Sequence, residues 1–136
     1  MSDAGYVPPF PKGWYVVAGS DEVPGPELVA LGAFGRDLVM GRDAAGEVRV
    51  TQDLCPHVGG LFSQGGRITD DCIVCPFHGW KFAADGACIE VPAGDSIPER
   101  ARVRMWKVRE RDGCIEVFHG RRGQVPDPDA EVFDRR

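Results

Sequence analysis

The sequence predicts an all-β fold, a compact sandwich or barrel of short antiparallel strands, and three observations support this. Helical periodicity is hard to find anywhere along the 136 residues. Glycine and proline, with 18 and 11 copies, interrupt the chain at short intervals. The apolar segments between these breaks are short and are joined by turns containing Gly or Asp, which is typical of antiparallel sheets.

Eight segments have the length and composition of strands. They are residues 14–18, 27–33, 37–42, 48–53, 72–74, 88–91, 103–108 and 115–118. We therefore divide the chain into an N-terminal arm (1–12), a β-domain (13–119) and a C-terminal tail or truncated linker (120–136). Within the domain, an insert at about residues 54–91 is expected to carry the functional loops.

Composition restricts the class of function. A length of 136 residues suits one domain, and 43 % apolar with 27 % charged residues is ordinary for a soluble globular protein. The net charge of −5 argues against nucleic acid or an anionic membrane as a partner. No apolar stretch approaches the roughly 20 residues of a spanning helix, and no basic leader precedes one. Five cysteines, an odd number, favour reduced thiols and a cytoplasmic location.

Two short motifs carry the chemistry. The first is C-P-H, from Cys55 to His57, and the second is C-P-F-H, from Cys75 to His78, with 17 residues between the two motifs. Each motif offers one thiolate and one imidazole. Such paired half-sites suit a two-iron [2Fe–2S] cluster in which cysteines hold one iron and histidines hold the other.

Two other interpretations of the cysteines and histidines fit the pattern less well. Structural zinc accepts two Cys and two His, but its ligands usually come as C-x₂₋₄-C with H-x₃₋₅-H, whereas here each motif mixes the two residue types. Cys72 and Cys75 form a C-x-x-C pair, but no helix is predicted after it, as a redox dithiol requires. Cys72, Cys88 and Cys114 are expected to be small core residues without a functional role.

The surroundings of the motifs fit a cluster held in tight loops. Pro56 and Pro76 directly follow the two motif cysteines and stiffen the chain there. Glycines permit tight loops whose backbone N–H groups can approach bridging sulfurs: Gly59, Gly60, Gly65, Gly66 and Gly79. Apolar side chains are expected to form a lid that limits water access: Val58, Leu61, Phe62, Phe77 and Trp80.

The stretches G-W-Y at 13–15, C-P-F-H-G-W-K-F at 75–82 and I-E-V-F at 115–118 resemble a known family. Over about residues 10–119 the chain is similar to the N-terminal Rieske domain of Rieske non-haem iron oxygenases, especially the ketosteroid-hydroxylase and cholesterol-desaturase type. The resemblance implies a Rieske fold, an antiparallel β-sandwich of three sheets with a cluster-binding subdomain. It also implies one [2Fe–2S] cluster per chain, with Cys55 and Cys75 on the inner iron and His57 and His78 on the outer iron.

Respiratory Rieske proteins are the contrasting branch of the family. They resemble this chain in the ligands but carry an additional Cys in each loop, which the loops here lack. Rieske proteins with a high reduction potential resemble one another in having two hydroxyl donors, a Ser and a Tyr, close after the second ligand pair. Trp80 and Phe82 stand at those places in this chain, so we expect a low potential.

The chain does not encode a complete oxygenase active site. Oxygen activation in the resembled enzymes needs a mononuclear iron held by two histidines and a carboxylate. Only His119 is left over from the motifs, and a solvated role at the end of the last strand is expected for it. No G-x-G-x-x-G fingerprint for NAD or flavin is present either.

Two functions remain open at this point. The first is a ferredoxin-like component that passes electrons from an NAD(P)H-dependent reductase to a non-haem iron oxygenase component. The alternative is the Rieske portion of a hydroxylating or desaturating oxygenase whose catalytic domain is absent or lies on another chain. The sequence predicts neither a substrate nor an oligomeric state.

Overall fold

A computed structural model describes residues 10–56, 60–77, 79–91, 96–97, 101–120 and 124–134. In these residues the regular structure consists of twelve strands and one short 3₁₀ turn, η1 (Ser20–Glu22). The strands form three four-stranded sheets, so the expectation of an all-β fold with three sheets is confirmed. Within the same described ranges, no helix has the length and apolar character needed to cross a membrane.

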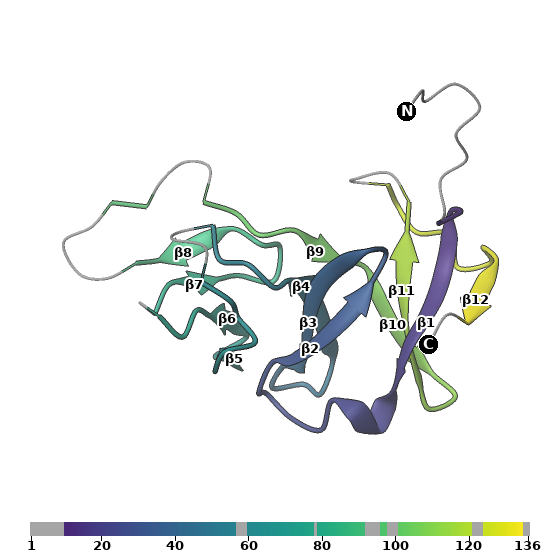
Figure 1. The fold of residues 1–136 in the computed structure, drawn as a ribbon, viewed down its shortest axis with the longest axis horizontal. Helices are drawn as coiled ribbons and strands as arrows, with labels where there is room; N and C mark the ends of the chain where they lie inside the picture. The colour runs from purple at the N-terminus through teal and green to yellow at the C-terminus, as the bar shows by residue number, and fades with distance from the viewer. Residues whose placement is uncertain are drawn as a thin grey trace.

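The first sheet lies at the right of Figure 1 and the third at the left, with the second sheet between them. In spatial order, the first sheet contains β10 (Val108–Arg111), β11 (Cys114–His119), β1 (Gly13–Gly19) and β12 (Val132–Asp134). The second contains β2 (Val29–Ala33), β3 (Arg36–Arg42), β4 (Val48–Gln52) and β9 (Met105–Trp106). The third contains β5 (Arg67–Thr69), β6 (Cys72–Val74), β7 (Lys81–Phe82) and β8 (Cys88–Glu90).

The middle sheet contributes to two cores, which explains the continuous apolar run in β3. Leu38 and Met40 pack in one core, between the first and second sheets, which we call the sheet core. Val39, on the opposite face of the strand, packs in the other core with residues of the third sheet. We call this second group the loop core. Because β3 is covered on both faces, all three side chains are buried.

The turn between β2 and β3 contains an unusual residue. Phe34 and Gly35 both have positive φ, 56° and 68°, a conformation in which a phenylalanine is uncommon. The Phe34 ring packs 5.1 Å from the ring of Tyr15 and 4.7 Å from that of His119, measured between centroids. These contacts connect the tip of the second sheet to the first sheet, and they offset the cost of the backbone conformation.

The observed strands agree with most of the expected segments and differ at three kinds of place. The segment 72–74 is a strand with the expected bounds, whereas 103–108 is divided between β9 and the start of β10. Two short strands, β5 and β7, were not expected. The segment 120–136, expected to be a tail or linker, contains β12, which pairs in parallel with β1.

An ion pair connects the first two sheets. The guanidinium of Arg42, on β3, donates to both carboxylate oxygens of Glu110, on β10, at 2.9 and 2.8 Å. Its other N–H groups donate to backbone oxygens of Ser20, Val23 and Gly46. The hydrogen bonds from Arg42 are the main reason that the pKa of Glu110 is lowered to about 2.

We expect Glu110→Gln to lower the free energy of unfolding at pH 7 by about 1 kcal/mol, because the charge-assisted hydrogen bonds weaken at a partly exposed site. The pKa of Glu110 is lower in the folded chain, so this stabilisation is present above pH 4.5 and is lost as pH falls towards 2. Urea titrations at pH 7 and at low pH measure the difference.

Glu27→Gln is the matched control. Glu27 is 3.9 Å from Arg67 and both side chains are largely exposed, so its removal is expected to change stability by less than about 0.5 kcal/mol. An equal loss of stability in Glu110→Gln at both pH values would contradict the assignment.

Candidate metal centre

The two motif cysteines begin loops that close in the same way. The N–H of Cys55 donates to the carbonyl oxygen of Gly60 at 2.8 Å, and the N–H of Cys75 donates to that of Trp80 at the same distance. Each bond spans five positions. We call residues 55–60 the first loop and residues 75–80 the second loop. His57 and His78 fall inside these loops by sequence but lie outside the described residues.

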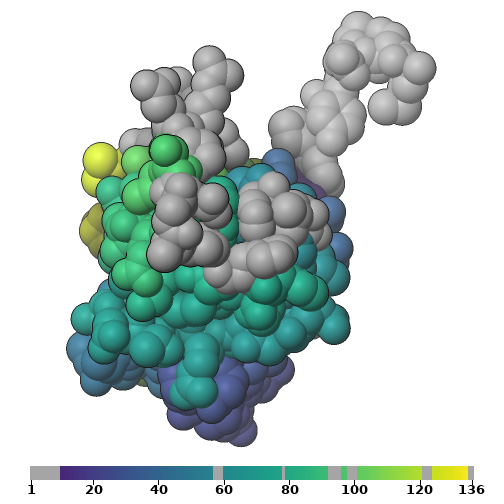
Figure 2. All heavy atoms as spheres, turned by 90° about the vertical axis from the view of Figure 1, so that its left-hand side faces the viewer, coloured from purple at the N-terminus to yellow at the C-terminus, as the bar shows by residue number. Residues whose placement is uncertain are grey.

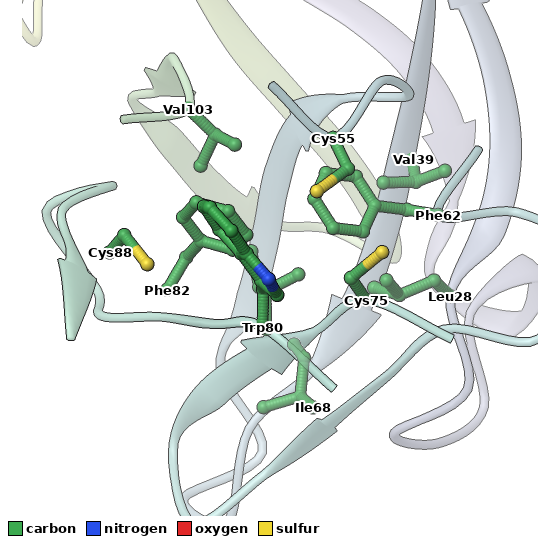
Figure 3. Packing of buried hydrophobic residues seen from close by; sticks show 11 residues of the cluster. Leu28, Val39, Cys55, Phe62, Ile68, Cys75, Trp80, Phe82, Cys88 and Val103 are labelled. Carbon is green, nitrogen blue, oxygen red and sulfur yellow. The ribbon is translucent and has the colours of Figure 1, made fainter. Parts of the chain in front are cut away.

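The structure brings the two cysteines together in the loop core. Cys55 is fully buried and Cys75 is 1 % exposed, and both belong to the same group of contacting residues. Figure 3 shows the two thiols near one another, beside the rings of Phe62 and Trp80. Both cysteines are free of disulfide bonds. Two buried thiols from two separate loops are the arrangement that one iron of a [2Fe–2S] cluster needs.

The two loops also contact each other directly. A Cβ atom at Gly60 would overlap the Cδ2 atom of the Phe77 ring in the second loop. It would also lie 2.9 Å from the Cε2 atom of that ring. A side chain at Gly65 would come within 3.6 Å of Pro76. Gly60 therefore allows the backbone of the first loop to lie against a ring of the second.

Of the described residues that were expected to form an apolar lid, two are buried and two are exposed. Phe62 and Trp80 are buried, at 0 % and 6 % exposure, and form part of the loop core beneath the thiols. Leu61 and Phe77 are exposed by 40 % and 50 %. Figure 2 views the molecule from the side of the third sheet, where the teal residues of this part of the chain form much of the surface. Val58 lies outside the described residues.

The described residues contain no group of three or more potential metal ligands among His, Cys, Asp and Glu. Both predicted histidine ligands are outside those residues, so only the cysteine half of the predicted set is placed by the structure. The set of Cys55, His57, Cys75 and His78 therefore stays a prediction.

The other three cysteines lie on strands, and of these only Cys88 is a buried core residue as expected. Cys88 is buried on β8, and burial is the main reason that the pKa of its thiol is raised. Cys72, on β6, and Cys114, on β11, are partly buried. After Cys75, the described chain continues into β7 and not into a helix, so the C-x-x-C pair lacks the setting of a redox dithiol.

His119 differs from its expected solvated state. It ends β11 among aromatic rings, with centroids of Phe34, Phe10 and Tyr15 at 4.7, 5.8 and 6.0 Å. Its Nδ1 atom is buried without a hydrogen-bond partner. Burial is the main cause that lowers the pKa of this imidazole, and the charges of Arg104 and Arg36 lower it further. No sequence pattern indicates this ring cluster, because its members come from distant segments.

Comparison with known proteins agrees with this geometry. Residues 13–107 match the Rieske [2Fe-2S] domain family, and the chain belongs to that family. It is 40 % identical over 127 residues to cholesterol 7-desaturase of Caenorhabditis elegans, covering 90 % of this chain and 30 % of the relative. It is 34 % identical over 131 residues to the oxygenase component of 3-ketosteroid-9-alpha-monooxygenase from Mycobacterium tuberculosis, covering 96 % and 34 %.

Solved structures show the same fold. The crystal structure of dicamba monooxygenase bound to dicamba superposes with a TM-score of 0.76 at 30 % identity, covering 86 % of this chain and 36 % of that one. The resemblance to the Rieske domains of steroid-acting oxygenases is thus confirmed. The chain spans about a third of the length of these proteins.

The central prediction for this site concerns iron and sulfide. The purified protein should be red-brown and contain about two irons and two acid-labile sulfides per chain. Cys55→Ser or Cys75→Ser should abolish the cluster and lower the stability of the fold, because cluster binding and folding are coupled. Metal and sulfide analysis with the visible spectrum measures both effects.

Cys114→Ser is the matched control and should retain iron and sulfide, since Cys114 lies on β11 in the first sheet. Stoichiometric zinc without sulfide in the wild-type protein would contradict the assignment.

Proposed function

We propose that this chain transfers one electron at a time through a [2Fe–2S] cluster held by Cys55, Cys75, His57 and His78. The observation that carries the proposal is the pair of buried, neighbouring thiols at the starts of two matched loops. Each loop contains one histidine by sequence. Membership of the Rieske [2Fe-2S] domain family supports the same cofactor.

Different residues of the chain have different roles in holding the cluster. Cys55 and Cys75 supply negative charge from a dry core, and neutral imidazoles on the other side reduce the net charge at the site. Phe62 and Trp80 exclude water beneath the thiols because both rings are buried. When bound, the cluster supplies reversible one-electron chemistry. Leu61, which follows the first loop, and Phe77, in the second loop, are exposed and accessible to a protein partner.

Of the two functions that the sequence leaves open, the alternative has the better support. The relatives are an oxygenase component, a desaturase and a monooxygenase, and this chain corresponds to about a third of each. We therefore propose that the chain is the Rieske portion of a hydroxylating or desaturating oxygenase system. The free-standing ferredoxin is the second candidate. In both cases we propose an NAD(P)H-dependent reductase as electron donor, a non-haem iron centre as acceptor, and a cytoplasmic location.

The first functional prediction separates electron transfer from oxygenation. Given a suitable reductase and NADH, this chain should pass electrons to cytochrome c or another artificial acceptor. It should form no oxygen-dependent product, because the sequence contains one histidine beyond the two motifs. The control is the reductase with acceptor and without the chain. Hydroxylation or desaturation of a substrate by the purified chain alone would contradict this prediction.

The second functional prediction concerns the reduction potential. Trp80 and Phe82 pack in the loop core and cannot donate a hydroxyl hydrogen bond to the cluster, and the Ser63 hydroxyl donates to Asp53 at 2.6 Å. We therefore expect a midpoint near the low end of the Rieske range, about −150 mV and not about +300 mV.

With a low potential, the imidazoles of His57 and His78 should keep their outer protons at pH 7, so the midpoint should be nearly independent of pH there. Protein-film voltammetry from pH 6 to 10 measures both properties. A midpoint above about +100 mV or a steep slope at pH 7 would contradict the low-potential assignment.

A further inference from the structure

The two loops of the candidate site are anchored by different means. The second loop is the end of a hairpin, since β6 and β7 pair antiparallel through Val74 with Lys81 and Ile73 with Phe82. The backbone ladder thus fixes both ends of that loop. The first loop leaves β4, whose neighbours in the sheet are β3 and β9. The chain returns through residues 60–66, which form turns and no strand, so no ladder closes the base of the first loop.

The side chain of Asp53 bridges this base. Its Oδ1 accepts the backbone N–H of Ser63 at 2.8 Å, and its Oδ2 accepts the Ser63 hydroxyl at 2.6 Å. Asp53 is only 6 % exposed, and its own N–H donates to the carbonyl oxygen of Asp37 on β3 at 3.0 Å. A buried carboxylate with both oxygens bonded to one residue is a strong and directional link, because hydrogen bonds to charged groups exceed neutral ones in strength.

Asp53 and Ser63 lie close in sequence to residues of the candidate site. Asp53 stands two positions before Cys55, and Ser63 follows Phe62 directly. The Phe62 ring is fully buried and meets the Phe82 ring edge-on, with centroids 5.8 Å apart. Phe62 also belongs to the loop core with Cys55 and Cys75. Fixing Ser63 therefore fixes the aromatic ring beneath the thiols as well as the return of the first loop.

We propose that Asp53 is a positioning residue for the cluster. Through Ser63, Asp53 holds the first loop at the distance from the second loop that a shared cluster needs. This bridge takes the place of the backbone ladder that anchors the second loop. This inference rests on the proposed function for the presence of the cluster. The bridge itself is a property of the chain and is measurable without reference to electron transfer.

The test compares three variants. Asp53→Ala removes both hydrogen bonds, and Ser63→Ala removes the hydroxyl bond alone. Asp53→Asn is the conservative change, because its amide oxygen can still accept the Ser63 N–H while its NH₂ donates to a hydroxyl that has turned. Asp43→Ala is the matched control. Asp43 has a side chain of 6 % exposure and accepts the N–H groups of Ala45 and Glu47 in a turn of the second sheet.

Hydrogen exchange, read by mass spectrometry, reports the bridge directly. In Asp53→Ala, exchange in the peptide 53–64 should rise by about tenfold or more, since a charge-assisted hydrogen bond is lost. Exchange in the peptide 72–82, which contains the second loop, should stay unchanged. Asp43→Ala should leave both peptides unchanged. Ser63→Ala should give a smaller rise in the exchange of the peptide 53–64. This variant replaces Asp53→Ala in the comparison if Asp53→Ala does not fold.

The cluster provides the second readout. In the protein reduced with excess dithionite, loss of the cluster to a ferrous-iron chelator without oxygen should be about tenfold faster in Asp53→Ala, by the same weakening of the loop. The EPR spectrum of reduced Asp53→Ala should show shifted g values and broadened lines. Asp53→Asn should restore a rate and a spectrum close to those of the wild-type protein.

Equal rises in exchange in both loops would show general destabilisation and overturn the proposal, as would unchanged exchange in Asp53→Ala. An Asp53→Asn protein that behaves like Asp53→Ala would also overturn it. If the wild-type protein contains no iron and sulfide, the proposed function fails, yet the exchange comparison on that protein still decides whether Asp53 anchors the first loop.

Discussion

The burial of two thiols in one apolar core is the constraint on which the rest of the structure depends. Cys55 and Cys75 come from different parts of the chain, and each must enter the core without exposing its backbone polar groups to an apolar medium. The matched hydrogen bonds to Gly60 and Trp80 solve this problem, because each cysteine N–H is satisfied inside its own tight loop.

A supporting layer is needed to hold the two loops against each other, and the middle sheet provides it. Its strand β3 contributes Val39 to the loop core and Leu38 and Met40 to the sheet core. The first sheet, joined to β3 by Arg42 and Glu110, stiffens that layer from the opposite side. The first and second sheets share the sheet core, so the packing of the first sheet supports the strand that contributes Val39 to the loop core.

The sequence predicts the fold class well, because the fold class depends on local signals, while the ligand set stays a prediction. Short apolar segments between glycines give the strands, and the motif spacing indicates the two thiols that the structure brings together. The strands β5 and β7 were missed because each contains a single apolar residue, Ile68 or Phe82, whereas the equally short segment 72–74 is apolar throughout. The strand β12 was missed because Val132–Asp134 acquires its role only by pairing with a distant strand.

The packing around Phe34 and the bridge of Asp53 were also beyond prediction. A phenylalanine at positive φ contradicts local preference, and the reason lies in rings from other segments, including that of Tyr15. Asp53 and Ser63 look like ordinary loop residues until the fold places them face to face. In both cases a tertiary contact decides the role of the residue, and no local pattern records it.

The central claim is that one histidine from each loop completes the ligand set of a two-iron cluster. Pulsed EPR of the reduced protein, with histidine labelled by ¹⁵N, tests it most directly. We expect couplings from two histidine nitrogens, one lost in a variant of His57 and the other in a variant of His78, with both retained in His119→Gln. A reduced cluster without any histidine nitrogen coupling would contradict the account.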